Sequence, residues 1–175
     1  MKLMIASDLH GSATWCARMV AAFDVERPDW LVLLGDLLYH GPRNALPDGY
    51  DPKGVIAQLN PLADHILAVR GNCDAEVDQM VLDFPMMADY AVIVDAARGR
   101  SLYCTHGHVQ TPQAHPRLPR GTVFLSGHTH VKTCGELPDG SGVVAFNPGS
   151  VSLPKDGSHS YGVYEDGALR HVVLA

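Results

Sequence analysis

Five short apolar runs in this chain each end at a compact group of aspartate, asparagine, histidine and glycine residues. In an Asp-x-His or His-x-His triplet at the end of a strand, the two outer side chains can point to the same side. Ligand sites in open α/β sheets lie at the carboxyl ends of the strands, so the pattern predicts a sheet with one functional edge. The five groups are Asp8-Leu9-His10, Gly35-Asp36, Gly71-Asn72-Cys73-Asp74, Thr105-His106-Gly107-His108 and Gly127-His128-Thr129-His130.

The residue types in these groups indicate a metal site. Glycine beside a predicted ligand, at positions 35, 71, 107 and 127, lets the backbone turn sharply and approach an ion closely. Imidazole, carboxylate and amide oxygen, with no thiolate, suit manganese, iron, zinc, cobalt or nickel better than copper(I) or an iron-sulfur cluster. We expect manganese first among these ions.

The first seventy residues predict a βαβαβ unit with a parallel sheet. Residues 2–7, 30–34 and 66–69 read as buried strands, each followed directly by polar residues. Apolar residues recur at helical spacing over 15–23, and a proline at the start of 52–62 is compatible with a first helical turn. The Pro- and Gly-rich segment 40–54 reads as a loop inserted after the second strand.

The second half of the chain has a different pattern, with short β-prone runs between Gly, Pro and Asp turns and little helical periodicity. We expect these runs to form a second, mixed or antiparallel sheet. The length of 175 residues and the hydrophobic content of 46% are consistent with one compact domain over residues 1–175. The runs lie at 90–94, 101–105, 122–126, 143–146 and 161–164.

Charge and cysteine usage narrow the class of protein. A formal net charge of -6 argues against stable nucleic-acid binding, because that affinity comes mainly from Lys and Arg. The apolar run before Asp8 is too short for a signal peptide, and no later stretch has the length of a membrane span. The four cysteines show neither a CxxC pair nor zinc-finger spacing, so we expect a cytoplasmic protein. The sequence leaves a homo-oligomer open.

The chain resembles the calcineurin-like metallophosphoesterase superfamily, and among its members the small bacterial phosphodiesterases of the YfcE type. The resemblance is carried by the five polar groups, by the run GDLLYHGPRNALPDGY, by RGNCD, and by FNPGSVSLP at 146–154. It implies a four-layer αββα sandwich in which two mixed β-sheets are flanked by helices. It also implies two divalent metals: Asp8, His10 and His130 would hold one, Asn72, His106 and His128 the other, and Asp36 would bridge them.

The activity that this resemblance implies is metal-dependent hydrolysis of small phosphodiesters by a metal-bridging hydroxide. The alternatives are a phosphomonoesterase of the same fold and a protein-binding scaffold, the role of a retromer subunit that lacks some of the ligand histidines. A nuclease acting on long polymers would need a basic surface, which a net charge of -6 does not favour. Because all seven ligand positions are filled here, the resemblance favours the enzyme.

One position departs from most of the superfamily. Cys73 follows Asn72, where most members carry the histidine that is thought to protonate the leaving oxygen. A neutral thiol can donate a proton, so we expect Cys73 to act on the leaving group and to perform less well on basic leaving groups. Alternatively, Cys73 only fills a tight turn and water supplies the proton. Asp74 would orient a neighbour or a ligand, or would cap an exposed helix.

Three further residues are candidates for contacts with substrate. His40 and Arg43 lie in the loop 40–54 and could reach a phosphate at the mouth of the site, although a solvated loop is an equal alternative. His108 is the second histidine of an HGH triplet and could contact either a metal or the substrate.

Overall fold

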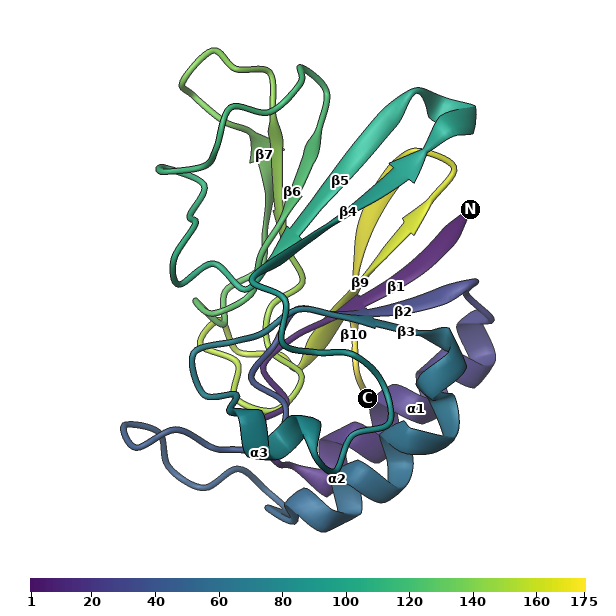
Figure 1. The fold of residues 1–175 in the computed structure, drawn as a ribbon, viewed down its shortest axis with the longest axis vertical. Helices are drawn as coiled ribbons and strands as arrows, with labels where there is room; N and C mark the ends of the chain where they lie inside the picture. Colours follow the sequence, from purple (N-terminus) through teal and green to yellow (C-terminus); the bar gives the residue numbers. More distant parts are fainter.

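Strand β1 (Lys2–Ala6) is buried on both faces and organises the fold. Leu3 points into an apolar core between two sheets, and Met4 points into a second core beneath the helices. Successive side chains of a strand point to opposite faces, so a strand covered on both sides is apolar throughout. In the computed structural model, which describes residues 1–175, two five-stranded sheets pack face to face around β1 (Figure 1).

The first sheet has the order β10-β9-β1-β2-β3. β1, β2 and β3 run parallel, as the βαβαβ pattern predicted, whereas β9 and β10 are antiparallel, which makes this sheet mixed. The strands beside β1 are β2 (Trp30–Leu33), β3 (Ile66–Ala68), β9 (Ser160–Glu165) and β10 (Ala168–Val173).

Two helices, α1 (Ala13–Glu26) and α2 (Pro52–Leu59), cover the outer face of the first sheet (Figure 1). The side chain of Ser12 accepts a hydrogen bond from the first turn of α1, which fixes the start of that helix. Short 3-10 segments follow at Asn60–His65 and Ala96–Arg98, and α3 (Glu76–Gln79) is a single turn. None of the helices combines the length and the apolar character that crossing a bilayer requires.

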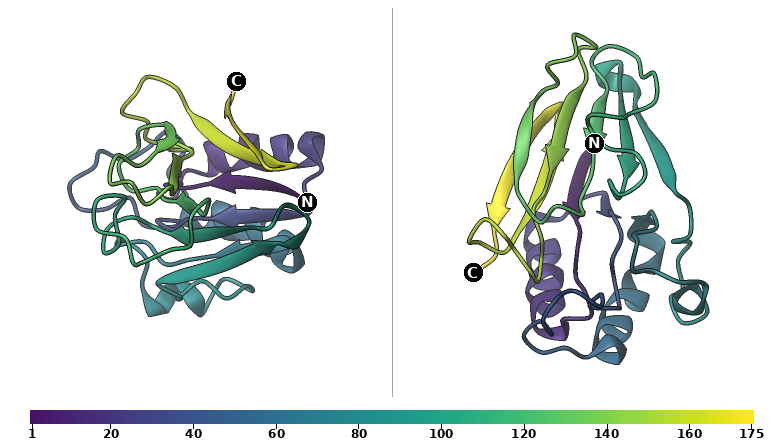
Figure 2. Two further views of the ribbon diagram at one scale, coloured as in Figure 1. Left: turned by 90° about the horizontal axis from the view of Figure 1, so that it is seen from above. Right: turned by 90° about the vertical axis from the view of Figure 1, so that its left-hand side faces the viewer.

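The second sheet has the order β4-β5-β6-β8-β7 and is also mixed, since β5, β6 and β8 are parallel while β4 and β7 are antiparallel. The expectation of two mixed sheets is confirmed. The outer face of this sheet is covered by long loops (Figure 2). Leu118 and Leu137 pack there against buried aromatic side chains. The strands are β4 (Tyr90–Asp95), β5 (Arg100–Thr105), β6 (Val123–Leu125), β7 (Thr133–Glu136) and β8 (Val144–Asn147).

One strand lies in a different sheet from the one expected. The run 161–164 forms most of β9, which pairs with β1 in the first sheet instead of joining the second. The physical reason is that the opposite faces of β9 complete both cores: Tyr164 packs between the sheets and Val163 packs on the helical side. The chain then turns back as β10, which closes that edge of the first sheet.

The end of α1 is tied to the first sheet by the carboxylate of Glu26, which contacts Lys2 of β1 at 2.8 Å and Arg170 of β10 at 2.8 Å. Burial opposes ionisation of this carboxyl group, but the two cations outweigh burial and lower its pKa below the ordinary 4.5. A pKa that is lower in the folded state gives stability above the unfolded-state value, and this stability is lost as the pH falls through the folded-state value.

We therefore expect Glu26→Gln to reduce the free energy of unfolding at pH 7 by about 1–2 kcal/mol. The difference from wild type should shrink towards zero below about pH 4, where the wild-type carboxylate takes up a proton. Urea unfolding at both pH values measures this change. Asp24→Asn, at an exposed position of the same helix, is the matched control and should have little effect at either pH.

Candidate metal centre

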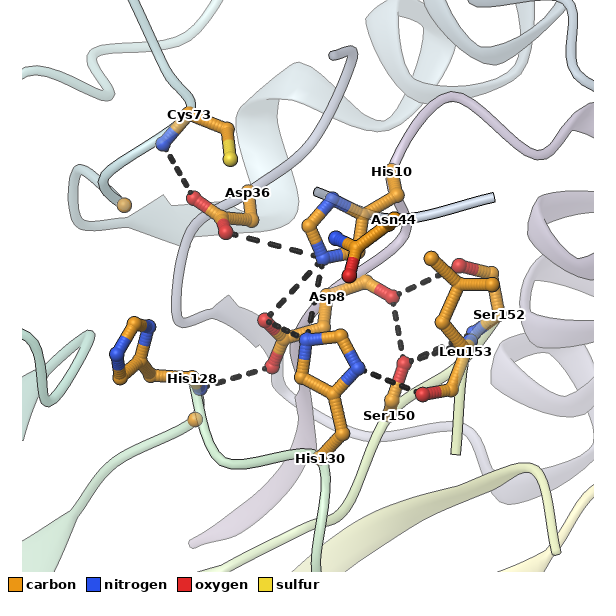
Figure 3. Close-up of polar contacts among 12 residues, drawn as sticks. Asp8, His10, Asp36, Asn44, Cys73, His128, His130, Ser150, Ser152 and Leu153 are labelled. Carbon is orange, nitrogen blue, oxygen red and sulfur yellow. Dashed lines mark hydrogen bonds and ion pairs between the residues drawn. The ribbon is translucent and has the colours of Figure 1, made fainter. Parts of the chain in front are cut away.

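Loops at the carboxyl ends of strands in both sheets meet at one point (Figure 3). The loops after β1, β2 and β3 come from the first sheet, and those after β5 and β6 come from the second. The structure thus brings together side chains that are up to 122 positions apart in the sequence. Six predicted ligands converge through side-chain contacts, and a seventh lies beside them: Asp8, His10, Asp36, Asn72, His106 and His130, with His128 alongside.

Asp8, His10 and His130 form the first cluster. The Nε2 atoms of the two histidines lie 3.2 Å apart. The distances from these atoms to Oδ1 of Asp8 are 3.6 Å for His10 and 3.2 Å for His130. Oδ1 of Asp8 is buried and has no hydrogen-bond donor. A buried carboxylate oxygen without a donor requires another source of positive charge.

The tautomers of the histidines point to that source. Nδ1 of His10 lies 3.0 Å from the carbonyl oxygen of Tyr39, and Nδ1 of His130 lies 2.6 Å from that of Leu153. A carbonyl only accepts, so Nδ1 carries the proton and, in the neutral ring, Nε2 presents a lone pair. Two lone pairs and the carboxylate of Asp8 therefore face one another, an arrangement that a divalent cation fits.

The second cluster is centred on Asp36 and His106. Nε2 of His106 lies 3.4 Å from Oδ2 of Asp36 and 3.1 Å from Oδ1 of Asn72. Its Nδ1 lies 2.7 Å from the carbonyl oxygen of Leu34, so in the neutral ring its Nε2 also presents a lone pair to an ion. Oδ2 of Asp36 lies 3.7 Å from Nε2 of His10, so this carboxylate is shared by both clusters. The ring of His128 lies edge-on to that of His106 with centroids 5.1 Å apart.

The charges in the site influence one another strongly. Burial raises the pKa of Asp8, but the neighbouring imidazoles of His10 and His130 outweigh it, so the pKa lies well below its ordinary value. Burial lowers the pKa of His106, but Asp36 and Asp8 outweigh burial and raise it to about 9. The lowered pKa of Asp8 and the raised pKa of His106 have the same cause, because buried carboxylates are stabilised by positive charge nearby.

The backbone at the site is in an uncommon conformation. Seven residues other than glycine have a positive φ, and five of them are predicted ligands. A left-handed conformation is costly for residues with a side chain and persists where surrounding structure enforces it. The strain turns each chain sharply at the end of its strand and aims the side chain at the centre. The five ligands are Asp8, His10, Asp36, His128 and His130.

Asp74 holds two of these loops together. Its carboxylate accepts hydrogen bonds from the backbone N–H groups of Asp36 at 2.8 Å, Leu37 at 2.8 Å and Gly71 at 2.7 Å. A side chain at position 71 would place its Cβ only 2.1 Å from Oδ1 of Asp36, so the close approach of the two loops requires glycine. Asp74 does not cap α3, whose N-cap is Ala75.

Two buried serines hold Asp8 in place from the other side. The hydroxyl groups of Ser150 and Ser152 donate to the carbonyl oxygen of Asp8 at 2.8 and 3.0 Å (Figure 3). Both belong to the segment at 146–154, which sequence analysis used only as part of the family resemblance. These bonds satisfy the carbonyl that the left-handed turn at Asp8 leaves without a partner in the sheet.

Cys73 lies at the edge of the site, where its backbone N–H donates to Oδ1 of Asp36 at 2.8 Å. Its Sγ lies within 4.8 Å of the ligand atoms of His10 and Asp36. Burial and the neighbouring carboxylates raise the pKa of this thiol to about 12, because both disfavour a thiolate. The thiol is therefore neutral near pH 7, which is the state that a proton donor requires.

A cavity of about 370 Å³ opens over the predicted ligands. Arg43 lines it, together with Asn44 and Lys155, which sequence analysis did not single out. His40 is not part of this lining, because its ring packs edge-on against Tyr39 and Tyr50.

His108 lies on the opposite side of the site. It faces a second cavity of about 530 Å³, and its ring centroid is 5.3 Å from that of His106. His128 lines both this cavity and the first. His108 and Arg43 therefore lie on different sides of His128.

Comparison with known proteins places this geometry in a family. A model of the calcineurin-like phosphoesterase superfamily domain matches residues 1–166. The chain is 46% identical over 176 aligned positions to Phosphodiesterase YfcE of Escherichia coli strain K12, and the match covers 99% of this chain and 92% of that protein.

Solved structures agree with the match in sequence. A structure of YfcE, a phosphoesterase from E. coli, superposes with a TM-score of 0.90 at 41% identity and covers 100% of both chains. A structure of an archaeal phosphodiesterase superposes with a TM-score of 0.67 at 21% identity, covering 99% of this chain and 100% of that one, and supports the fold alone.

The bonds of Asp74 lead to a prediction about the metal centre. Asp74→Asn replaces one accepting oxygen with an NH2 group that cannot accept, so either Leu37 or both Asp36 and Gly71 lose the acceptor of their backbone N–H. We expect affinity for manganese to fall about 10- to 100-fold, as is usual when a partner behind a ligand is lost. Calorimetric titration of metal-stripped protein measures the affinity.

Asp78→Asn is the matched control, because Asp78 also accepts from a backbone N–H, but only from that of Ala75 at the start of α3. Equal manganese affinity in Asp74→Asn and wild type would show that Asp74 does not position Asp36.

Proposed function

Because the chain belongs to the calcineurin-like phosphoesterase superfamily, we propose that it is a metal-dependent phosphodiesterase acting on small phosphodiesters. The convergence of imidazole lone pairs on the buried carboxylates of Asp8 and Asp36 is the observation that carries the proposal. The 46% identity to Phosphodiesterase YfcE over nearly the whole chain supports a diester as substrate.

Two divalent ions fit the two clusters. In this proposal Asp8, His10 and His130 hold one ion, the second cluster holds the other, and Asp36 contacts both. When bound, such a pair supplies hydroxide near neutral pH and offsets charge on the phosphoryl oxygens. Manganese is the proposed ion, since it suits a mixture of carboxylate, amide and imidazole ligands. The residues of the second cluster are Asn72, His106 and His128.

The protein's own groups would orient the reactants and supply a proton. The thiol of Cys73 lines the cavity beside the predicted ligands and is neutral near pH 7, so it is the proposed donor to the leaving oxygen. Asp74 would act as a positioning residue, because its carboxylate contacts backbone N–H groups and does not line the cavity. The four cysteines are free, which supports function in the reducing cytoplasm.

The first test compares hydrolysis of bis(p-nitrophenyl) phosphate with that of p-nitrophenyl phosphate. Metal-stripped protein is titrated separately with manganese, iron, zinc and magnesium. We expect turnover only with added metal, with manganese among the most effective ions and with the diester preferred. Preference for the monoester would favour a phosphomonoesterase, and no turnover with any ion in folded protein would favour a binding scaffold.

The role of Cys73 is tested by Cys73→Ser and Cys73→His on diesters with aryl and alkyl leaving groups. A proton donor matters most when the leaving group is basic. We expect Cys73→Ser to lower kcat about tenfold or more on the alkyl diester, with less change on the aryl diester. Cys73→His should raise kcat on the alkyl diester. Unchanged rates in both variants on both substrates would exclude proton donation by the thiol.

A further inference from the structure

The cavity over the predicted ligands continues into a groove that the proposed reaction does not use. A neighbouring cavity of about 410 Å³ shares Asn44, His130 and Lys155 with the first. One wall of the groove is the loop after β2 that carries Asn44, which lies in front of His10 in Figure 3. The other wall is the loop 152–155, and His159 also lines the groove.

The charge along this groove is positive. Arg43 and Lys155 are exposed, and neither forms an ion pair with a carboxylate, whereas six other Lys and Arg side chains do. Asp36 is the only carboxylate residue that lines either cavity. Arg43 lines the first cavity and Lys155 lines both, so the two cations lie where the first cavity joins the groove. In a protein with a net charge of -6, two such cations without acidic partners favour an anionic ligand.

Both cations are carried by loops that are tied to the site. The backbone N–H of Lys155 donates to the carbonyl of His130 at 3.0 Å, and the same histidine bonds Leu153 through Nδ1. On the facing loop, the side-chain amide of Asn44 donates to the carbonyl of His40 at 2.8 Å and braces the turn that carries Arg43. The backbone positions of the two cations are therefore set by the fold, although their side chains reach into solvent.

We propose that the substrate carries a second anionic group, a phosphate or a carboxylate, bound between Arg43 and Lys155. The inference rests on the proposed function, in which the two metals hold the phosphoryl group that is attacked. The arm of the diester that extends along the groove would then place its own anion at the two cations. Guanidinium and ammonium groups bind such oxygens through charge-assisted hydrogen bonds.

The test uses three p-nitrophenyl propyl phosphate diesters whose propyl arm ends in a methyl group, a carboxylate or a phosphate. The leaving group is the same in all three, so differences in kcat/KM report recognition of the arm. We expect wild type to prefer a charged arm, and Arg43→Ala or Lys155→Ala to reduce the ratio of charged to methyl arm about tenfold. Comparing the two charged arms distinguishes phosphate from carboxylate. Added salt should weaken the preference.

Lys53→Ala is the matched control, since Lys53 is exposed, forms no ion pair and does not line the groove. It should leave the ratio unchanged. An equal loss on all three diesters in the Arg43 and Lys155 variants would assign both cations to the transferred phosphoryl group and overturn the proposal. A wild-type enzyme without preference for a charged arm would also overturn it.

Binding gives a readout that does not depend on turnover. Propyl phosphate and propane bisphosphate are titrated calorimetrically into the manganese-loaded wild type and each variant. We expect about tenfold tighter binding of the bisphosphate in wild type only. If no diester is hydrolysed, the proposed function fails, but tighter binding of the bisphosphate would still support the second anion site. Equal binding of both ligands by wild type would overturn it.

Discussion

The metal centre depends on a set of lone pairs that face one another in a buried space. In each of three histidines Nδ1 donates a hydrogen bond to a backbone carbonyl, so in the neutral ring the Nε2 lone pair faces a buried carboxylate. One of these carboxylate oxygens, Oδ1 of Asp8, has no donor at all. A protein interior tolerates such an arrangement only when positive charge enters it. The backbone carbonyls that accept from Nδ1 fix the tautomer of each histidine. That tautomer determines whether Nε2 can bind an ion.

The same arrangement explains why the five loops that carry the predicted ligands need support from other parts of the chain. Left-handed turns at Asp8 and Asp36 cost free energy, which neighbouring bonds must offset. Ser150 and Ser152 bond the carbonyl of Asp8 from one side, while Asp74 bonds the backbone beside Asp36 from the other. Since these braces come from distant parts of the sequence, the geometry of the site depends on both sheets being formed.

Sequence analysis predicted the strands and ligand groups that have a local sequence pattern. It missed an exposed strand and a strand pairing between distant parts of the chain. Buried parallel strands have a continuous apolar pattern that breaks at the polar turn, so the ligand groups and the first three strands were visible. β7 (Thr133–Glu136) is exposed and has no such pattern, and the pairing of β9 with β1 leaves no local mark. The approach of Lys155 to the site depends on the fold of the 146–154 segment, and no motif marks it.

The hydrogen bonds from the histidines to backbone carbonyls also affect the exchange of metal ions. Because backbone atoms of ordered strands and loops fix the rings, the ligand geometry is built by folding and does not have to be assembled by the ion. In small zinc-dependent domains, by contrast, losing the ion unfolds the chain. Here one ion could be exchanged for another while the two sheets stay intact, because the bonds that fix the rings do not pass through the ion. Occupancy would then follow the supply of ions around the protein.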